Sequence, residues 1–300
     1  MKQDQPKRRP EWIKVRSRSS AKYDRIRELV RKESLHTVCE EARCPNRSEC
    51  WGESGTATFM ILGDTCTRSC KFCNVNTGRP SAIDWDEPKR IANAVRIMNL
   101  NHAVITSVTR DDYPDGGALV FARCIERIRQ VQPECTVEVL IPDFRGEIDS
   151  LNTVIQAKPD ILNHNVETVK RLFREVQPQD KYEWAKATLC NAKKLNPDQT
   201  TKSGIMVGLG EEFDEVVETM SDLREWGVDI LTIGQYLQPT KHHLPIDRYY
   251  HPDEFESLRA IGYELGFSWV ESGPLVRSSY HAAEQMGAKK PPQQTSPHSK

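Results

Sequence analysis

Apolar and polar residues follow two alternating patterns along most of this 300-residue chain. Short, mostly apolar runs have the length and composition of buried strands. They lie at Thr58–Leu62, Ala103–Val108, Thr136–Ile141, Asp160–Asn165, Ser203–Leu209 and Ile230–Tyr236. Longer segments have apolar residues three and four positions apart, which is the spacing of an amphipathic helix. They lie at Pro88–Met98, Ala118–Gln130, Ile148–Gln156, Thr168–Glu175, Glu183–Leu195, Glu215–Trp226 and Glu254–Leu265.

Strands that alternate with helices form parallel sheets with right-handed crossovers. The pattern therefore predicts an α/β fold, an incomplete (β/α)6 TIM-like barrel over residues 55–268. An N-terminal arm with a cysteine motif is expected over 1–54, and a C-terminal extension over 269–287. The tail 288–300 is rich in Pro, Gln and Ser and has nothing to bury, so we expect it to be disordered.

Composition narrows the classes of protein that fit this fold. The formal net charge of -1 argues against broad electrostatic capture of nucleic acid. The chain has no apolar run long enough to cross a bilayer, and its start lacks the apolar core of a signal peptide. Nine cysteines is an odd number, which favours metal-bound thiols in a reducing, cytoplasmic setting over disulfides. Trp12 and Ile13 predict that the N-terminal arm packs on the protein.

Six of the nine cysteines form two triplets, Cys39, Cys44, Cys50 and Cys66, Cys70, Cys73. Three thiolates can bind three irons of a cubic iron-sulfur cluster and leave the fourth iron open, whereas a structural zinc site has four ligands. The second triplet comes directly after the first predicted strand. In barrels of this type the chemistry lies at the C-terminal ends of the strands, so the triplet is well placed for catalysis.

The second triplet has the spacing C-x3-C-x2-C, with the aromatic Phe72 before its last cysteine. This pattern resembles the radical S-adenosylmethionine superfamily. The resemblance implies a 4Fe-4S cluster on Cys66, Cys70 and Cys73, whose open iron binds S-adenosylmethionine. It also implies reductive cleavage of that molecule to a 5'-deoxyadenosyl radical, which takes hydrogen from an unactivated carbon. No side-chain base can do this, because the pKa of an aliphatic C–H lies far outside the range that proteins tune.

Other segments resemble further S-adenosylmethionine contacts of this superfamily. Gly204 to Glu211 resembles its adenine-side motif, and glycines there allow close backbone approach. The implied contact residues are Phe72, Asn165, Glu167, Gly208, Gly210 and Arg110. Asn165 and Glu167 end the fourth predicted strand, and Arg110 follows the second, where it could pair with a carboxylate. We interpret His242 and His243 as loop residues near the substrate entrance, because adjacent histidines project in different directions.

The first triplet, C-x4-C-x5-C, and the segment Gly273 to His281 narrow the resemblance to the lipoyl synthase family. That resemblance implies insertion of two sulfur atoms, at C6 and C8 of an octanoyl chain on a lysine of a carrier domain. It implies that an auxiliary 4Fe-4S cluster on Cys39, Cys44 and Cys50 is consumed as the sulfur source. It also implies that Ser279 binds the fourth iron of this cluster.

A serine is an unusual ligand, because an alkoxide is harder than a thiolate and its hydroxyl is a weaker acid. We hypothesise that protonation releases Ser279 and so opens one iron of the auxiliary cluster. The implied partners are octanoylated carrier domains of 2-oxoacid dehydrogenase E2 subunits and of the glycine cleavage H protein. A low-potential donor such as ferredoxin or flavodoxin, and iron-sulfur carrier proteins, are also implied. Neither nucleic acid nor a membrane is expected as a partner.

Two other interpretations remain open at this stage. A different radical enzyme with an auxiliary cluster, one that modifies transfer RNA or closes a cofactor ring, would share the barrel and the second triplet. Alternatively, His36 could join Cys39, Cys44 and Cys50 in a zinc site that stabilises a binding module.

Overall fold

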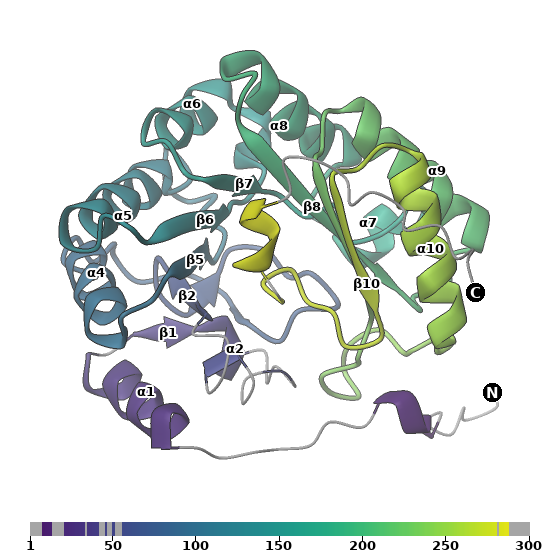
Figure 1. Ribbon diagram of the computed structural model, residues 1–300, viewed down its shortest axis with the longest axis horizontal. Helices are drawn as coiled ribbons and strands as arrows, with labels where there is room; N and C mark the ends of the chain where they lie inside the picture. Colours follow the sequence, from purple (N-terminus) through teal and green to yellow (C-terminus); the bar gives the residue numbers. More distant parts are fainter. Residues whose placement is uncertain are drawn as a thin grey trace, which may run out of the picture.

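The fold is built on one curved, mostly parallel sheet (Figure 1). The computed structural model describes residues 8–13, 21–33, 35–41, 46, 50–51, 56–280 and 282–287. The order of strands in the sheet is β1-β2-β5-β6-β7-β8-β9-β10. These strands are β1 (His36–Thr37), β2 (Thr56–Ile61), β5 (His102–Ser107), β6 (Thr136–Leu140), β7 (Ile161–Asn163), β8 (Thr200–Val207), β9 (Ile230–Gln235) and β10 (Trp269–Gly273). The order is linear with β1 and β10 at its edges, so the barrel is incomplete, as predicted.

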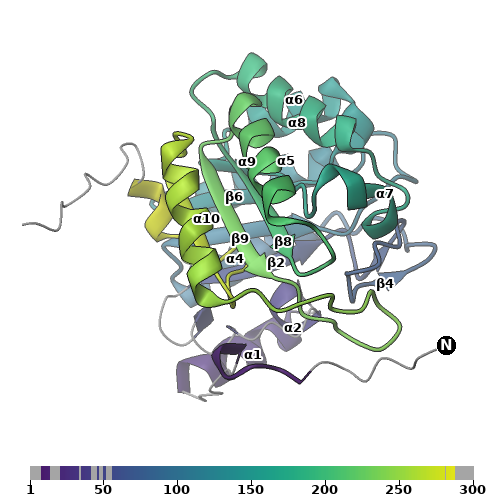
Figure 2. The same ribbon diagram turned by 90° about the vertical axis from the view of Figure 1, so that its right-hand side faces the viewer.

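Helices cover the outer, convex face of the sheet. The helices of the barrel are α4 (Glu87–Met98), α5 (Ala118–Val131), α6 (Ile148–Gln156), α7 (Phe173–Val176), α8 (Tyr182–Leu195), α9 (Phe213–Glu225) and α10 (Pro252–Glu264). Before the barrel lie α1 (Ala21–Lys32) and α2 (Val38–Glu41). Short 3-10 helices are η1 (Glu11–Ile13), η3 (Phe144–Gly146), η4 (Lys170–Leu172) and η5 (Glu284–Gly287). Figure 2 shows α8, α9 and α10 packed outside β8 and β9.

The sequence explains these layers. All residues of β2 and of β9 are buried, as expected for parallel strands that are covered on both faces. On α5 the buried residues include Phe121, Cys124, Ile125 and Ile128, three and four positions apart, so one stripe of the helix faces the sheet. Among the described residues, the strands from β2 to β10 pair in parallel, and β1 pairs with β2 in the antiparallel direction.

Several elements differ from the expected pattern: α1, β1, β3 (Thr65–Cys66) and β4 (Asn76–Thr77) were not predicted, and two further differences concern the barrel. Strand β10 was not predicted, because its residues are only alternately buried and include Glu271 and Ser272. It lies within the predicted C-terminal extension, yet it adds a parallel strand to the sheet. The predicted helix Thr168–Glu175 begins only at Lys170, since Val169 has extended backbone angles (φ -70°, ψ 155°), and it consists of the 3-10 turn η4 followed by α7.

The C-terminal extension enters the concave side of the sheet, where it is the yellow segment inside the arc of strands (Figure 1). Gly234 on β9 makes this approach possible, because a Cβ at this position would collide with the backbone oxygen of Val276. The guanidinium of Arg277 donates to the backbone oxygen of Gln235 at 3.3 Å. From the N-terminal side, Asn46 donates through Nδ2 to the backbone oxygen of Leu275 at 2.7 Å. The extension is therefore held by the barrel and by the N-terminal segment.

The N-terminal arm packs on the barrel, as predicted. Trp12 Nε1 donates to the backbone oxygen of Tyr250 at 3.2 Å, and the rings of Trp12 and His251 form a T-shaped pair with 5.1 Å between their centroids. Ile13 is buried. The predicted tail 288–300 lies outside the described residues.

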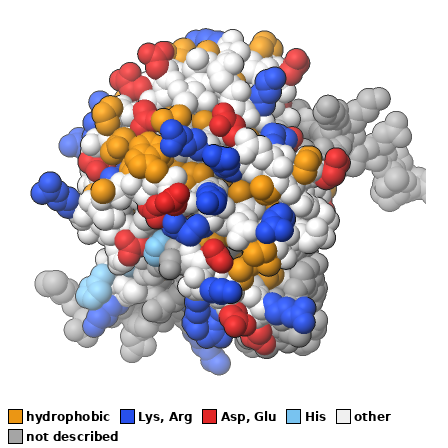
Figure 3. All heavy atoms as spheres, turned by 90° about the vertical axis from the view of Figure 1, so that its left-hand side faces the viewer, with side chains coloured by type: hydrophobic (Ala, Val, Ile, Leu, Met, Phe, Trp, Pro, Cys, Tyr) orange, Lys and Arg blue, Asp and Glu red, His pale blue; other side chains and the backbone are white. Residues whose placement is uncertain are grey.

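The surface agrees with the near-neutral composition. Lysine and arginine side chains are interspersed with aspartate and glutamate on the face shown in Figure 3. Within the described part of the chain, no helix combines the length and the apolar character needed to cross a membrane.

Candidate active site

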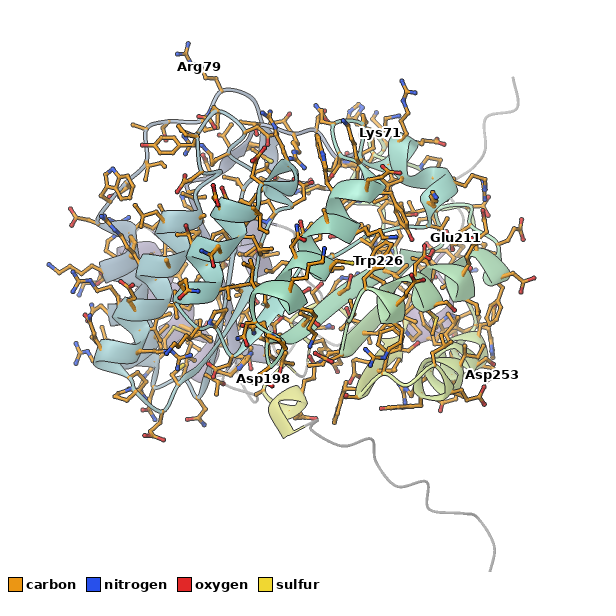
Figure 4. The ribbon with its side chains drawn as sticks, turned by 90° about the horizontal axis from the view of Figure 1, so that it is seen from above. Lys71, Arg79, Asp198, Glu211, Trp226 and Asp253 are labelled. Carbon is orange, nitrogen blue, oxygen red and sulfur yellow. The ribbon has the colours of Figure 1, made fainter. Side chains whose placement is uncertain are left out.

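The Cys66–Cys73 loop follows β2 at the C-terminal end of the sheet. Figure 4 shows Lys71 of this loop at one end of the molecule and Asp198, which precedes β8, at the other. A small second sheet closes the base of the loop, with β3 (Thr65–Cys66) parallel to β4 (Asn76–Thr77). Cys66 Sγ accepts hydrogen bonds from the backbone N–H of Arg68 at 3.4 Å and of Thr109 at 3.2 Å. Such N–H donors to sulfur are one means by which proteins tune iron-sulfur clusters.

The three cysteines of this loop are partly buried and close enough to influence one another. Burial raises the pKa of the Cys70 thiol far above its usual range, and the neighbouring Cys73 and Cys66 thiols raise it further. Burial, with Cys66 as a lesser cause, raises the pKa of Cys73 to about 11. Three crowded soft donors are hard to ionise unless cations are bound among them, because a bound metal reverses the local electrostatics. The loop therefore fits a cluster with three cysteine ligands.

Among the described residues, no group of three or more His, Cys, Asp or Glu side chains is arranged to hold a single metal ion. In a cubane cluster each cysteine binds a different iron, so a site of that kind differs from a site for one ion.

Loops from around the barrel hold the backbone of the Cys66–Cys73 loop. The N–H of Thr67 donates to the oxygen of Thr109 after β5, and that of Lys71 donates to the oxygen of Val176 at the end of α7. His243 Nε2 donates to the oxygen of Cys73 at 3.0 Å. This histidine is held in turn by a hydrogen bond of 2.9 Å between its Nδ1 and Thr240 Oγ1. His243 thus supports the cysteine loop, a role that its place in a loop after the sixth predicted strand did not indicate.

A buried ionic group behind the loop was also not predicted. The guanidinium of Arg68 lies among the carboxyl groups of Asp111, Asp143 and Asp180. Arg68 is only 4% exposed. The sequence signal was the arginine between Cys66 and Cys70, but its partners are far away in the chain.

Asn165 and Glu167 lie where β7 ends, as the sequence predicted. Asn165 Nδ2 donates to Glu167 Oε1 at 3.0 Å and to Ser278 Oγ at 2.7 Å. Asn165 Oδ1 is buried and has no hydrogen-bond partner among the described residues. Burial raises the pKa of Glu167 to about 7. An orphaned acceptor beside a carboxyl group fits a ligand that carries hydroxyl or amino donors, such as S-adenosylmethionine.

The segment Gly204 to Glu211 mainly makes contacts within the protein, whereas we expected it to contact S-adenosylmethionine. Glu211 accepts hydrogen bonds from the backbone N–H of Gly208 at 2.5 Å and of Leu209 at 2.9 Å, which closes the turn after β8. A Cβ on Gly208 would collide with the side chain of Gln235, so the close approach allowed by this glycine is to the protein itself. The space beside Gly210 is open, because a Cβ at this position would have its nearest neighbour, an atom of Asp247, 4.0 Å away.

Arg110 and Phe72 also have partners within the protein. Arg110 is 2% exposed, and its guanidinium donates to Asp112 and to the backbone oxygens of Leu62 and Ser81. These contacts favour a role in fixing the loops after β2 and β5 over a direct contact with a ligand carboxylate. Phe72 is partly buried against the apolar core under β8 and β9.

The residues proposed for the auxiliary cluster are only partly described. Cys39 lies in α2 with its side chain outside the described part, and Cys44 lies outside the described residues. Cys50 and Ser279 line one small cavity, together with Asn46, Thr56, Thr58, Arg277 and Tyr280. A thiol and a hydroxyl from opposite ends of the chain thus share a cavity on the concave side of the sheet. This donor pair fits the implied ligand set of one cluster.

Two protein-family models match this chain. Residues 60–223 match the radical SAM superfamily, and residues 1–44 match the N-terminal domain of lipoyl synthase of the radical SAM family. The chain is similar to the lipoyl synthase of Rubrobacter xylanophilus, with 61% identity over 277 residues, which are 92% of this chain and 86% of that protein. It is also similar to the lipoyl synthase of Bacillus subtilis, with 53% identity over 285 residues, which are 95% and 96% of the two chains. Among solved structures, methylornithine synthase has a similar fold, with a TM-score of 0.54 and 12% identity over 92% of this chain and 85% of the other.

Proposed function

This chain belongs to the lipoyl synthase family of radical S-adenosylmethionine enzymes, and we propose that its two cysteine triplets hold two 4Fe-4S clusters with separate tasks. The activity is the insertion of two sulfur atoms, at C6 and C8 of an octanoyl chain attached to a lysine of a carrier protein. Cys66, Cys70 and Cys73 bind the cluster that works with S-adenosylmethionine. Cys39, Cys44, Cys50 and Ser279 bind the auxiliary cluster.

The chemistry that the bound groups supply is a reductive cleavage of S-adenosylmethionine, which yields a radical that removes hydrogen from the octanoyl chain, followed by sulfur transfer from the auxiliary cluster. The chain's own residues position the groups that take part in this chemistry. The N–H groups of Arg68 and Thr109 hold the sulfur of Cys66. Asn165 and Glu167 orient the ribose or the amino group of S-adenosylmethionine, and Gly210 leaves room beside it.

The observation that carries this proposal is the position of the R-S-S-Y segment, residues 277–280. Ser279 lines a cavity with Cys50, while the adjacent Ser278 accepts a hydrogen bond from Asn165. One short segment therefore touches the residues proposed for both tasks. A substrate radical that formed beside Asn165 would lie near the sulfur source, which is what two successive insertions, at C6 and C8, require.

The proposal extends to partners and location. Octanoylated carrier domains of 2-oxoacid dehydrogenase E2 subunits and of the glycine cleavage H protein are the substrates, in the cytoplasm. A low-potential electron donor such as ferredoxin or flavodoxin reduces the clusters, and iron-sulfur carrier proteins rebuild the auxiliary one. A mixed-charge surface agrees with brief contacts to several carriers.

An anaerobic assay tests the proposal. Purified protein should be brown and contain about eight iron and eight sulfide ions per chain. With an octanoyl-lysine peptide, S-adenosylmethionine and a reductant, we expect 5'-deoxyadenosine and a peptide mass gain that corresponds to two sulfurs replacing two hydrogens. Cleavage of S-adenosylmethionine without sulfur transfer would contradict the proposed activity. Colourless protein that contains zinc would contradict the cluster assignment altogether.

A further inference from the structure

We propose that Arg68, held by Asp111, Asp143 and Asp180, is a positioning residue that keeps the Cys66–Cys73 loop in its ligand-binding shape before any cluster is bound. The inference rests on the proposed cluster site and adds to it a residue whose side chain binds neither metal nor substrate.

The contacts of Arg68 are numerous and short. Its Nε and Nη2 donate to the two oxygens of Asp111 at 2.8 and 3.0 Å. Its Nη1 and Nη2 donate to the two oxygens of Asp143 at 2.6 and 2.8 Å. A third carboxyl group, that of Asp180, lies 3.0 Å from Nη1. The planar guanidinium fits two carboxylates in a paired geometry that an ammonium group cannot reproduce.

The three partners come from separate parts of the barrel. Asp111 follows β5, Asp143 follows β6, and Asp180 precedes α8. The position of Asp143 is itself fixed, because its carboxylate accepts the backbone N–H of Arg145 at 2.7 Å at the start of η3. Beside Asp180, Gln179 Oε1 accepts the backbone N–H of Ser69 at 3.1 Å. One side chain of the cysteine loop is thereby tied to three loops that the strands hold rigidly.

The charged groups around Arg68 are buried, so each of them depends on its partners within the group. The side chain of Asp143 is 0% exposed and those of Asp180 and Asp111 are 11% and 16% exposed. Charges at such depth are tolerated only when they are paired, and removing one partner is strongly destabilising. Burial and the adjacent Asp143 raise the pKa of Asp180 to about 8, which allows three carboxyl groups to pack around one guanidinium.

The loop needs such an anchor because it has little regular structure of its own. Its second sheet consists of two pairs of residues, and all three cysteines are only partly buried. Arg68 connects the sulfur of Cys66 with the buried carboxyl groups. Its backbone N–H donates to Cys66 Sγ, while its side chain is held by the carboxyl groups. Losing the side-chain contacts would free the backbone that sets the spacing of the thiols.

Hydrogen exchange of the full-length apoprotein tests the inference without any cluster. In Arg68→Met, we expect the amides of residues 67–71 to exchange about a hundredfold faster than in wild type, since breaking a buried ion pair favours local opening. Amides of β8 and β9 report the global stability, so the effect at residues 67–71 is measured as the acceleration beyond any change in these strands. Arg129→Met is the control for the loss of an arginine outside the site, because Arg129, in the last turn of α5, also pairs with a carboxylate, that of Asp160, although its side chain is 36% exposed.

Reconstitution with iron and sulfide supplies the second readout, with the auxiliary cluster as internal control. Arg68→Met should bind about four irons instead of about eight, with the auxiliary cluster retained. Arg68→Lys keeps the charge but loses the paired geometry, so we expect an intermediate result in a variant that folds readily. Unchanged exchange at 67–71, or full loading of both clusters in Arg68→Met, would overturn the inference. If wild type itself failed to bind two clusters, the proposed function would fail instead.

Discussion

Ser278 and Ser279 are neighbours in the chain with different surroundings. Ser278 accepts a hydrogen bond from Asn165, whereas Ser279 faces the cavity that Cys50 also lines. We predict that Ser279→Cys lowers sulfur insertion about tenfold or more while cleavage of S-adenosylmethionine persists, because a thiolate is a softer ligand that dissociates from iron less readily than an alkoxide. The measurement is the ratio of thiolated peptide to 5'-deoxyadenosine.

Ser278→Ala is the companion variant to this test. It removes the hydrogen bond to Asn165, which contributes about 1 kcal/mol, so it should weaken S-adenosylmethionine binding several-fold. A Ser279→Cys enzyme with the wild-type product ratio would show that ready release is not the reason for a serine at this position.

Glu211 stabilises the turn after β8 by accepting two backbone N–H groups, and it is 4% exposed. Glu211→Ala leaves both donors without this acceptor, so we predict a loss of about 2–4 kcal/mol in the free energy of unfolding. Urea denaturation of the apoprotein measures it. Glu211→Gln retains one acceptor oxygen and should lose less. Equal stability of the two variants would indicate that water replaces the carboxylate.

At the level of residues, the sequence predicted what depends on local spacing and missed what depends on distant partners. The spacing of the cysteines lies within one loop, so it could be recognised directly. The partners of Arg68 lie 43 and 75 residues away for Asp111 and Asp143, and no local pattern connects them. We predicted that Arg110 binds a ligand because the sequence does not reveal its partners within the protein. Its buried contacts with the backbone of Leu62 and Ser81 can be recognised only in three dimensions.

At the level of elements, two glycines on adjacent strands test how the C-terminal extension docks. Gly234 on β9 and Gly273 on β10 are partners in the sheet register. A Cβ on Gly234 would collide with the backbone of Val276, whereas a Cβ on Gly273 would lie 3.4 Å from the Val276 side chain. We predict that Gly234→Ala displaces residues 274–280 and lowers auxiliary-cluster content, while Gly273→Ala is nearly neutral.

Limited proteolysis near the C-terminus and iron content measure this effect. Cleavage should be faster in Gly234→Ala only, because the backbone of the extension cannot yield without leaving the sheet. If both alanine variants behaved alike, the close approach at Gly234 would not be what positions the R-S-S-Y segment.

The six predicted strands and most of the predicted helices are present in the structure. They could be predicted because the residues of each follow one continuous pattern of burial. For example, Ile148–Gln156 was predicted with the boundaries that α6 has. Strand β10 was missed because one of its faces meets the extension and carries polar residues. The late start of the next helix, at Lys170, follows from Glu167, which has a positive φ of 67° and still pairs with Ile205 of β8. Neither tertiary constraint can be recognised in a short window of sequence.

At the level of the whole molecule, the sheet contains one buried group of polar and charged side chains. Glu138 and Lys202 are both 0% exposed, and Lys202 Nζ lies 3.0 Å from Glu138 Oε1. Asn163 Nδ2 donates to the same carboxylate at 2.9 Å, and His102 Nε2 lies 3.7 Å from it. These side chains link β5, β6, β7 and β8, so they couple most of the sheet through one buried charge pair.

The pH dependence of stability follows from this pair. Burial by itself would raise the pKa of Glu138, but Lys202, His102 and Asn163 outweigh it and lower the pKa to about 2. Burial also lowers the pKa of Lys202, and Glu138 only partly opposes this. The cost of burying the charged Lys202 thus offsets some of the stabilisation that the lowered pKa of Glu138 alone would indicate. Because the folded-state pKa of Glu138 is below its unfolded value, its contribution is present above about pH 4.5 and is lost as the pH falls toward 2.

We therefore predict that Lys202→Met loses about 3–5 kcal/mol at pH 7, because it leaves Glu138 buried without its cation. In this variant Glu138 is stabilised by protonation, so acidification from pH 7 to 5 should reduce the deficit relative to wild type. The double variant Lys202→Met, Glu138→Leu should recover most of the stability, since an apolar pair of similar volume replaces both charges. Urea denaturation of the apoproteins across this pH range measures all three. A Lys202→Met deficit that is constant from pH 7 to 5 would show that Glu138 does not take up a proton in this range, and it would contradict the expected relief by protonation.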